Sequence, residues 1–598
     1  MAPSVAIIGA GFGGLCMAIQ LERAGIHSYT VFEKADGLGG TWRDNSYPGA
    51  GCDIPSHLYS YSFEKYASWT RRYPEQPEIL EYLERCADKY DVRRKIHFST
   101  EVRRATFDGS KWHLTVAPTN PSHPTPGTSP AASPGTSAGY GRDDGGRGGG
   151  VGGGDGLGGG ELGSGGLGSD VGDFGGGGLG GGGQGSDVGG GRGRGGDGAD
   201  GGVGGGGVGG GGLGGDVGGV GGGGLSGGDE GGGGGGGRTE VFDVVVVGVG
   251  QLNRPRLPDI SGMLEFEGIS FHSARWNHAH DLTGRRVAVI GNGSSAAQFV
   301  PRIAERVERL YVFQRTPNWV IPKPDTTFGP LAKLALRLVP GLQRAYREWI
   351  YRYAEATLYP ALAQGWSKNV LKQRALRHLH AQVPDPALRA KLTPDYPPGC
   401  KRVVIDSSFY PALTRPNVEV VTDKIVRITA KGVETTEGPY EVDTIVYATG
   451  FTSTEFLAPM EVRGRGGRSL TDRWKDGAEA YLGISVPDFP NMFLLYGPNT
   501  NLGHNSIVFM IECQVNHIMS CLPHLTASGP IEVRPEAMAA WSRQLDAAME
   551  RMVWSGGCQS WYKTAEGRIT NNWPGPTTLY RRLTAEPPRP AYRTIAPE

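Results

Sequence analysis

Short apolar runs that end in glycine turns alternate along the chain with longer amphipathic stretches. The first run, VAIIGAGFGG at residues 5–14, predicts a buried strand and a turn, and LCMAIQLERAG at 15–25 predicts a helix. The same order recurs in RRVAVIGNGSSAAQFV at 285–300. Strands that alternate with helices in this way are typical of doubly wound parallel sheets. The pattern therefore predicts an α/β fold that contains two such units.

A glycine-rich tract interrupts this pattern from 118 to 237 and holds most of the 101 glycines. It has too little apolar surface to offset its ordering entropy, so we expect a disordered insertion. Before it, KWHLTVAP (111–118) alternates like an edge strand, and after it TEVFDVVVVGVG (239–250) is typical of one buried strand with a glycine turn. We therefore expect a hairpin loop that has been expanded, either as an inert insertion or as a binding or condensation module.

Leu, Ala, Arg and Tyr periodicity after 323 predicts a helical insertion in the second unit. Its first part, 328–360, is interrupted by basic residues and predicts amphipathic helices, with weak contact to a membrane surface as an alternative. The predicted first domain comprises 1–117, 238–262 and 443–598. The second comprises 263–322 and 398–442, and the helical insertion comprises 323–397.

Composition excludes several classes of protein. Lys+Arg and Asp+Glu both number 60, so no net charge favours nucleic acid as a partner. No apolar run reaches the ~18 residues of a membrane-spanning helix, and the N-terminal residues show no secretory signal. The seven cysteines are scattered without CxxC or Cys/His spacing, so we expect reduced thiols, no metal site and a cytoplasmic protein. We also expect a monomer or dimer.

The first glycine turn carries a dinucleotide motif. Gly9, Gly11 and Gly14 have GxGxxG spacing between strand and helix, which lets the backbone approach a pyrophosphate at the helix N-terminus. Glu33 stands about twenty residues on, at the end of the next predicted strand, where a carboxylate accepts ribose hydroxyls. We expect FAD at this site.

The second glycine turn has Gly291 and Gly293 in the same positions, followed by Ala296 or Ala297. Its next strand, ERLYVFQRT, ends with Arg315 instead of a carboxylate, which suits the 2′-phosphate of NADPH. The alternative is that Arg315 is an ordinary surface residue. NADPH would reduce the flavin, and because no CxxC pair is present to receive the electrons, oxygen is the favoured acceptor.

Two further motifs resemble those of type I Baeyer–Villiger monooxygenases, within the flavin-containing monooxygenase superfamily. FEGISFHSARWN (266–277) is similar to the family pattern FxGxxxHxxxW, with Asn277 as a departure. GGTWRDNSYPGAGCD (39–53) resembles the pattern (A/G)GxWxxxxYPGxxxD. The similarity extends to YATGF (447–451), GPNTNLGHNS (497–506) and SWYKTAEGRITNNWPG (560–575), and covers nearly the whole chain outside the glycine tract.

The resemblance implies an enzyme that consumes NADPH and inserts one oxygen atom of O2 beside a ketone carbonyl through a flavin peroxide, giving an ester or lactone. In PPGCKRVVIDSSFYP (397–411), Arg402 matches the catalytic arginine and Asp53 would hold it, while Lys401 and Arg315 would clamp the 2′-phosphate. The structural alternative for Asp53 is a cap on a helix begun by IPSHLYSY (54–61).

Two further residues are implied by the same resemblance as parts of the catalytic machinery. His272 would link the domains and their movement around NADP, although a lone histidine is also common in protein cores. Trp561 resembles a mobile-loop tryptophan that reaches the nicotinamide, with a core or anchoring role as the alternative. The full set expected to bind the cofactors is Gly9, Gly11, Phe12, Gly14, Glu33, Lys34, Gly40, Thr41, Trp42, Tyr47, Asp53, Tyr59, Gly291, Gly293, Ser294, Ser295, Arg315, Thr316, Lys401, Thr449, Gly450 and Asn505.

Two rival functions stay open from the sequence. An N- or S-oxygenating flavin-containing monooxygenase would act on an amine or sulfide instead of a ketone. A nucleotide-binding scaffold or uncoupled NADPH oxidase would use the glycine tract to bind a partner. Val249, in VVVVGVGQLNRP, stands where a threonine is usual in such turns, and we expect the flanking glycines to preserve the turn.

Overall fold

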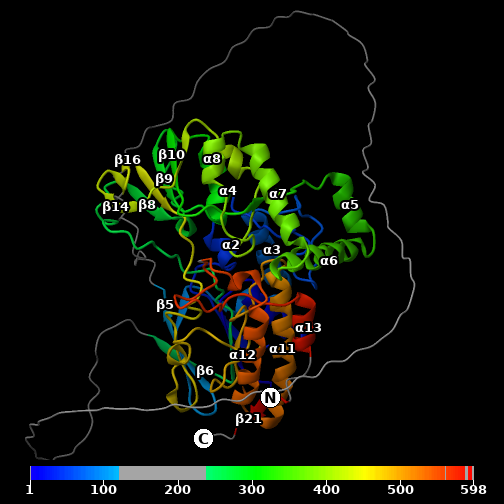
Figure 1. The fold of residues 1–598 in the computed structure, drawn as a ribbon. Helices are drawn as coiled ribbons and strands as arrows, with labels where there is room; N and C mark the ends of the chain where they lie inside the picture. Colours follow the sequence, from blue (N-terminus) through cyan, green and yellow to red (C-terminus); the bar gives the residue numbers. More distant parts are fainter. Residues whose placement is uncertain (1, 120–236, 559, 586–589, 596–598) are drawn as a thin grey trace, which may run out of the picture. The chain divides into compact units, whose positions relative to one another are not determined.

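The computed structural model describes residues 2–119, 237–558, 560–585 and 590–595 (Figure 1). All of these residues belong to one compact unit. The predicted disordered insertion lies outside the described residues, apart from 118, 119 and 237.

The first sheet is parallel, with the strand order β19-β7-β1-β2-β3. Its strand β1 is buried on both faces. Val5 and Ile7 pack in a cluster with helices α1, α3 and α11, while Ala6 and Ile8 pack against a second, mainly antiparallel sheet. Burial on both faces explains why β1 is a continuous apolar run. The elements are β1 (Val5–Ile8), α1 (Phe12–Arg23), β2 (Tyr29–Phe32), α3 (Gln76–Lys89), β3 (Ile96–His97), β7 (Val244–Val247), β19 (Met492–Leu494) and α11 (Ile507–Ser528).

The second parallel sheet repeats this plan, with the strand order β13-β10-β9-β17-β8. Val287 and Val289 of β9 pack with helix α4, and Ala288 and Ile290 pack against the small sheet β14-β15-β16. The prediction of two Rossmann-like units in an α/β fold is thus confirmed. The elements are β8 (Ile269–His272), β9 (Arg286–Ile290), α4 (Ser294–Ile303), β10 (Arg309–Phe313), α9 (Phe409–Leu413), β13 (Val418–Val421), β14 (Ile425–Thr429), β15 (Gly432–Thr435), β16 (Gly438–Glu441) and β17 (Thr444–Tyr447).

The strands that flank the glycine-rich tract form a hairpin. Strand β5 (Trp112–Pro118) pairs antiparallel with β6 (Arg238–Phe242), so the prediction that the tract expands a hairpin loop is confirmed. Two details of the prediction are wrong. Strand β5 is an interior strand instead of the predicted edge strand, because it lies between β4 (Thr100–Phe107) and β6 in the order β18-β4-β5-β6. Strand β18 is Glu461–Arg463. The stretch 239–250 contains two strands instead of the predicted one, and they separate at Asp243. Strand β6 is largely exposed and joins this sheet, whereas β7 is fully buried in the first sheet.

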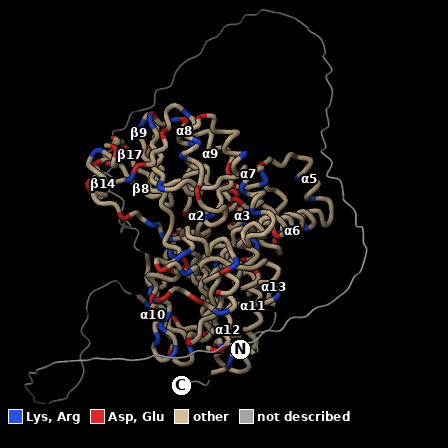
Figure 2. Tube along the Cα trace, in the orientation of Figure 1, with Lys and Arg blue, Asp and Glu red and all other residues tan. Residues whose placement is uncertain are grey.

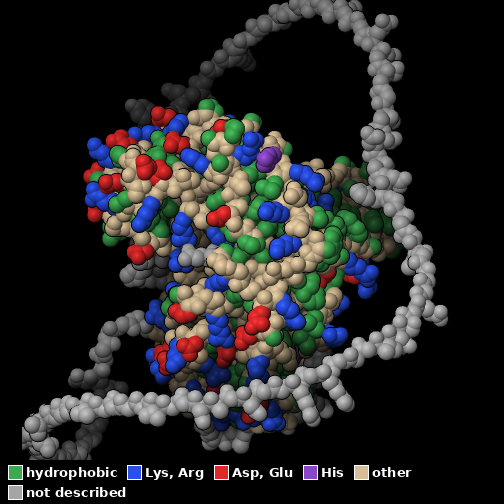
Figure 3. Space-filling view, in the orientation of Figure 1, with side chains coloured by type: hydrophobic (Ala, Val, Ile, Leu, Met, Phe, Trp, Pro, Cys, Tyr) green, Lys and Arg blue, Asp and Glu red, His purple; other side chains and the backbone are tan. Residues whose placement is uncertain are grey.

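The predicted helical insertion consists of α5 (Pro330–Leu338), α6 (Leu342–Leu362), α7 (Ser367–Gln382) and α8 (Pro386–Lys391). It is bracketed by the short parallel strands β11 (Val320–Ile321) and β12 (Val404–Ile405), which pair with each other. Apolar side chains gather over α5 and α6 at the right of Figure 3. Leu331 and Leu338 of α5 are exposed. Among the described residues no helix is long and apolar enough to cross a membrane. Basic and acidic residues are interspersed along the trace (Figure 2).

Arg347 of α6 ties the insertion to the first domain. Its guanidinium donates to the backbone carbonyls of His57 and Ser60 at 2.7 and 2.9 Å, and it lies 3.8 Å from the carboxylate of Glu512. The remaining elements are α2 (Thr41–Asp44), α10 (Leu470–Arg473), β20 (Ile531–Val533), α12 (Pro535–Met549), α13 (Thr577–Ala585), β21 (Tyr592–Thr594) and the 3-10 turns η1 (Arg93–Lys95), η2 (Ser273–Arg275), η3 (Arg465–Gly467) and η4 (Val553–Ser555).

Candidate active site

The first glycine turn joins β1 to α1, and its three glycines meet different constraints. Gly9 has φ +99°, and a Cβ there would lie 2.7 Å from the carbonyl oxygen of Gly248. A Cβ on Gly14 would lie 1.8 Å from the carbonyl oxygen of Gly9, so Gly14 permits the helix to pack on the turn. Gly11 faces a cavity and has no atom within 3.6 Å of an added Cβ. That space suits a pyrophosphate at the N-terminus of α1.

Glu33 follows β2 and faces the same cavity. One carboxylate oxygen accepts from the backbone N–H of Ala10 at 2.7 Å and the other from that of Ala35 at 2.9 Å. Burial raises the pKa of Glu33, and these two N–H donors oppose that rise. The carboxylate is therefore oriented by the glycine turn, in the position where a ribose hydroxyl donates in dinucleotide folds.

The second glycine turn joins β9 to α4. Gly291 has φ +112°, and a Cβ there would lie 2.4 Å from the carbonyl oxygen of Ala448. Gly293 has no atom within 4 Å of an added Cβ and also faces the cavity. Ser294 and Ser295 begin the helix without a side-chain cap on its free N–H groups. The turn can thus receive a second pyrophosphate.

Residues 39–53 lie between the two turns. The Trp42 indole N–H donates to the Tyr59 hydroxyl at 3.2 Å on the first-domain side. On the other side, the Tyr47 hydroxyl donates to Gln298 Oε1 at 2.9 Å, and Gln298 Nε2 donates to the carbonyl of Gly51 at 2.9 Å. Gln298 belongs to α4, so this segment connects the two glycine turns and delivers Asp53 to the cavity between them.

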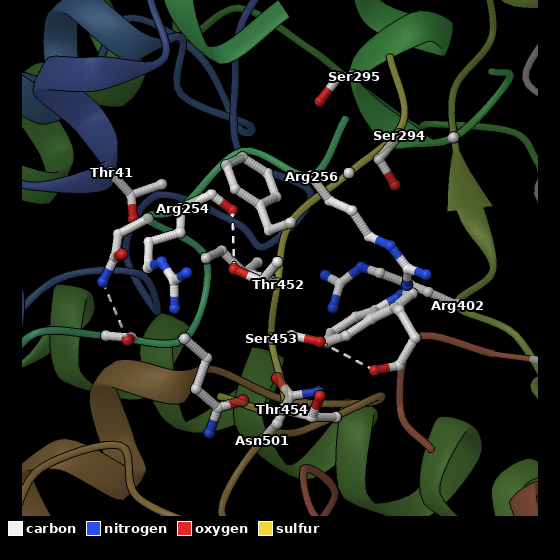
Figure 4. Close-up of a pocket in the computed structure, with 18 of the residues that line it drawn as sticks. Thr41, Arg254, Arg256, Ser294, Ser295, Arg402, Thr452, Ser453, Thr454 and Asn501 are labelled. Carbon is white, nitrogen blue, oxygen red and sulfur yellow. Dashed lines mark hydrogen bonds between the residues drawn. The ribbon is translucent and has the colours of Figure 1, made fainter. Parts of the chain in front are cut away.

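Asp53 and Arg402 form an ion pair on the cavity wall, where Arg402 Nη2 donates to Asp53 Oδ2 at 2.6 Å. Burial is the largest single influence and would raise the pKa of Asp53, but the charge and hydrogen bond of Arg402 together with the charge of Lys323 outweigh it and hold that pKa below its usual value. The Asp53 carboxylate in turn raises the pKa of Arg402. The described residues 54–61 form no helix, so the alternative role of Asp53 as a helix cap is wrong. Figure 4 shows Arg402 at the cavity with Ser294 and Ser453.

A second cationic group lies beside Arg402. Lys401 Nζ donates to Thr316 Oγ1 at 2.5 Å, and both residues line the cavity with Arg315. Burial lowers the pKa of Lys401, and the nearby charge of Arg315 lowers it further. Two like charges held together in this way favour an anion between them, such as a phosphate.

His272 lies off the cavity wall. It ends β8, its Nδ1 accepts from the backbone N–H of Ala274 at 3.1 Å, and its ring lies 6.0 Å from that of Phe451. Among the described residues its Nε2 has no hydrogen-bond partner, and burial lowers the pKa of His272 to about 4, so the ring is neutral near pH 7. The structure therefore places His272 behind the turn that contains Gly450 instead of at the cavity.

Trp561 lies at the cavity, in the segment after η4. The Ser453 hydroxyl donates to its carbonyl at 2.9 Å (Figure 4), and its ring is 4.4 Å from that of Tyr562. Close to it, Cys400 and Cys558 form a disulfide. The expectation that all cysteines are reduced thiols is therefore wrong for this pair. The two cysteines are 158 residues apart, and spacing along the chain gives no sign of a contact that only the fold creates.

The predicted cofactor residues gather around one cavity of about 2090 Å³. Its lining includes every member of the predicted set except Gly14, which faces the helix contact described above. Sequence reasoning missed Gln298, which no motif marks, and Tyr562, which directly follows Trp561 in the SWYK segment. Tyr562 is buried beside Arg402, and burial raises its pKa to about 12, with the charge of Arg402 opposing.

Two dinucleotide turns that share one cavity with a partly buried Arg–Asp pair define the class of flavin- and nicotinamide-dependent oxidoreductases. Comparison with known proteins agrees. Residues 7–76 match the model of the NAD(P)-binding Rossmann-like domain, and residues 233–337 match that of the flavin-binding monooxygenase-like family.

Close relatives cover nearly the whole chain. A Baeyer–Villiger monooxygenase of Pseudomonas aeruginosa is 34% identical over 98% of this chain and 90% of that protein. One of Streptomyces coelicolor is 34% identical over 99% of this chain and 93% of that protein. Among solved structures, an oxidized steroid monooxygenase bound to NADP is 28% identical with a TM-score of 0.71 and 100% of both chains covered. A closed cyclohexanone monooxygenase is 25% identical with a TM-score of 0.71 and 99% of both chains covered.

The chain therefore belongs to the Baeyer–Villiger monooxygenases, within the flavin-binding monooxygenase-like family. It is an FAD- and NADPH-dependent monooxygenase, and the predictions of family, enzyme class and cofactors are confirmed.

Proposed function

We propose that this protein oxidises a ketone to an ester or lactone, with NADPH as reductant and O2 as the source of the inserted oxygen atom. The observation that supports this proposal most directly is the ion pair between Arg402 and Asp53, on the wall of a cavity that both dinucleotide turns share. A fixed cation there is suited to a reaction in which negative charge develops on oxygen.

FAD would occupy the first turn, with its pyrophosphate at Gly11 and a ribose at Glu33, and NADP would occupy the second turn at Gly293. Both glycines leave open space in the cavity where a side chain would begin, so the residues present fit both groups. When bound, FAD accepts a hydride from NADPH and activates O2 for transfer to the substrate.

Arg402 would stabilise the negative charge that forms on oxygen as the carbonyl is attacked. The lowered pKa of Asp53 keeps its carboxylate ionised near neutral pH, so Asp53 holds the guanidinium in one orientation and supports its charge. The two residues would act as a unit, with Asp53 as the positioning residue for Arg402.

Arg315 and Lys401 would bind the 2′-phosphate of NADP, since they bring two positive charges to one part of the cavity wall. Trp561 would contact the nicotinamide side of the same cavity. His272 would act at a distance from the substrate, by supporting the turn at Gly450 through its neutral ring.

The test is an assay of purified protein with NADPH and a panel of ketones that includes cyclohexanone and a steroid ketone, beside amines and sulfides. Ester or lactone should form in step with NADPH consumed. Arg402→Ala should slow product formation about 100- to 1000-fold while flavin reduction by NADPH persists. Oxidation of amines or sulfides alone would place the protein with the N- and S-oxygenases, and hydrogen peroxide as the sole product with every compound would favour the uncoupled oxidase.

A further inference from the structure

The disulfide between Cys400 and Cys558 joins two segments that carry residues of the active site. Cys400 stands two residues before Arg402, and Cys558 stands three residues before Trp561. The Cα atoms of the pair are 6.3 Å apart. Breaking or forming this disulfide therefore changes how the Trp561 segment is attached to the Arg402 segment.

The two sulfur atoms differ in access. Cys400 is fully buried, in an apolar cluster with Leu362 and Trp554, whereas Cys558 is partly exposed and lines the cavity. A small reagent in the cavity can reach Cys558 but not Cys400. The accessible member is thus the one that reacts first in either direction.

The remaining thiols are more deeply buried than Cys558, although Cys52 also lines the cavity. Cys16, Cys52, Cys86, Cys513 and Cys521 are all buried and unpaired, and burial raises the pKa of each. Buried thiols with raised pKa values contain little thiolate and react slowly. Oxidation chemistry at cysteine is therefore concentrated at one place in this chain, the cavity wall.

We propose that Cys400 and Cys558 form a site of reversible oxidation, with hydrogen peroxide as the oxidant and a small dithiol as the reductant. In the forward direction, the Cys558 thiolate attacks one oxygen of hydrogen peroxide, which gives a sulfenic acid and, after protonation, one water. The Cys400 thiol then attacks that sulfur, the S–S bond forms, and a second water leaves. Two thiols have lost two electrons, and one peroxide has become two waters.

Reduction takes a different route, by thiol–disulfide exchange. A thiolate of the dithiol attacks the accessible sulfur of Cys558, and Cys400 leaves and takes a proton. The second thiolate of the reagent attacks the mixed disulfide, which releases Cys558 and leaves the reagent as a cyclic disulfide. The buried position of Cys400 protects it from direct attack.

The segment around Trp561 keeps other anchors when the S–S bond is open. The Ser453 hydroxyl donates to the Trp561 carbonyl, Lys563 Nζ donates to the Gly556 carbonyl at 2.8 Å, and Tyr562 stays in the apolar cluster. Reduction should therefore loosen this segment without unfolding the protein. If the proposed function holds, a looser Trp561 segment also protects the reaction from water less well, so more of the NADPH consumed yields hydrogen peroxide.

The experiment begins with covalent state, which does not depend on activity. After treatment with excess hydrogen peroxide, alkylation in denaturant should label five of the seven cysteines, and peptide mapping should find Cys400 joined to Cys558. After dithiothreitol all seven should be labelled. Seven labelled cysteines in the peroxide-treated protein, or a disulfide between other cysteines, would overturn the proposal.

Hydrogen exchange then tests the mechanical consequence. Peptides that contain Trp561 should exchange several-fold faster after reduction, and Cys558→Ser should show the fast rate in both states. Cys521→Ala, a buried cysteine far from the cavity wall, serves as the control and should respond to reduction as the unaltered protein does. Equal exchange rates in the oxidised and reduced protein would show that the disulfide does not restrain the Trp561 segment.

The activity assay comes last and separates the two proposals. The share of NADPH electrons recovered as hydrogen peroxide should rise several-fold on reduction and in Cys558→Ser. If no ester or lactone forms in any redox state while the disulfide is mapped, the proposed function fails and the oxidation site stands. If product forms in the unaltered protein and its yield is the same in both redox states and in Cys558→Ser, the link between this site and catalysis is refuted.

Discussion

The dependence of Arg402 on Asp53 leads to a quantitative prediction. Asp53→Asn keeps the shape of the side chain but removes its charge, so the contact at 2.6 Å loses its ionic component. A hydrogen bond between charged groups contributes about 1.5–3 kcal/mol. Arg402 and Asp53 are 31% and 22% exposed, so solvent screens part of this energy and the lower end applies. We expect ketone oxygenation to slow about 10-fold.

Arg402→Ala removes the cation itself and should cost about 100- to 1000-fold, the usual effect of losing one charge-stabilising donor. Because Asp53 acts through Arg402, the double variant should be no slower than Arg402→Ala alone. The assay is product formation with a saturating ketone, together with a stopped-flow measurement of flavin reduction by NADPH, which should be unchanged in all three variants.

Asp325→Asn is the matched control. Asp325 is 19% exposed and pairs with Arg71 at 3.1 Å, but it does not line the cavity, so its variant should retain full activity. The reasoning would be refuted if Asp53→Asn slowed the reaction a further ~10-fold in the Arg402→Ala background, because Asp53 would then act independently of the arginine.

Three other predictions test the fold and the second turn. Burial and the charge of Arg347 lower the pKa of His57 from 6.5 to about 4, so its contribution to stability is present above pH 6.5 and is lost as the pH falls toward 4. That loss amounts to about 3 kcal/mol. His57→Gln should therefore reduce the fall in melting temperature between pH 6.5 and pH 4, and an unchanged dependence of melting temperature on pH would contradict this role of His57. Gly293→Ala should leave the melting temperature unchanged, because no described residue beyond its neighbours in the chain lies within 4 Å of the added Cβ. The same variant should raise the KM for NADPH about tenfold or more; a normal KM would place the pyrophosphate elsewhere. Replacing 120–236 by a short turn should preserve the fold, because β5 and β6 pair directly. It should also raise the melting temperature, because closing a shorter loop costs about 2–3 kcal/mol less entropy. Loss of the flavin spectrum would show that the hairpin needs the tract.

Local pattern was enough to predict the two dinucleotide folds. A buried strand, glycines at fixed spacing and a following helix are contiguous in sequence, and the contact that requires Gly14 lies within its own turn. The contacts that require Gly9 and Gly291 are made with Gly248 and Ala448, so the motif marks these glycines but only the fold supplies their neighbours. The same holds for the hairpin, since β5 and β6 carry their own strand patterns whatever separates them. The family motifs added Asp53 and Arg402, which the fold brings together across a separation of 349 residues.

What the sequence by itself determined is thus the class of fold, the two glycine turns and, through the family motifs, the two residues that form the ion pair of Arg402 and Asp53. Tertiary structure alone decided the interior position of β5, the split of 239–250 between two sheets, the distance of His272 from the cavity and the bond between Cys400 and Cys558. Each of these depends on which surfaces meet when distant segments pack. Residue type and spacing record the needs of a single turn or strand, whereas a contact across 158 residues is decided by the packing of the whole molecule.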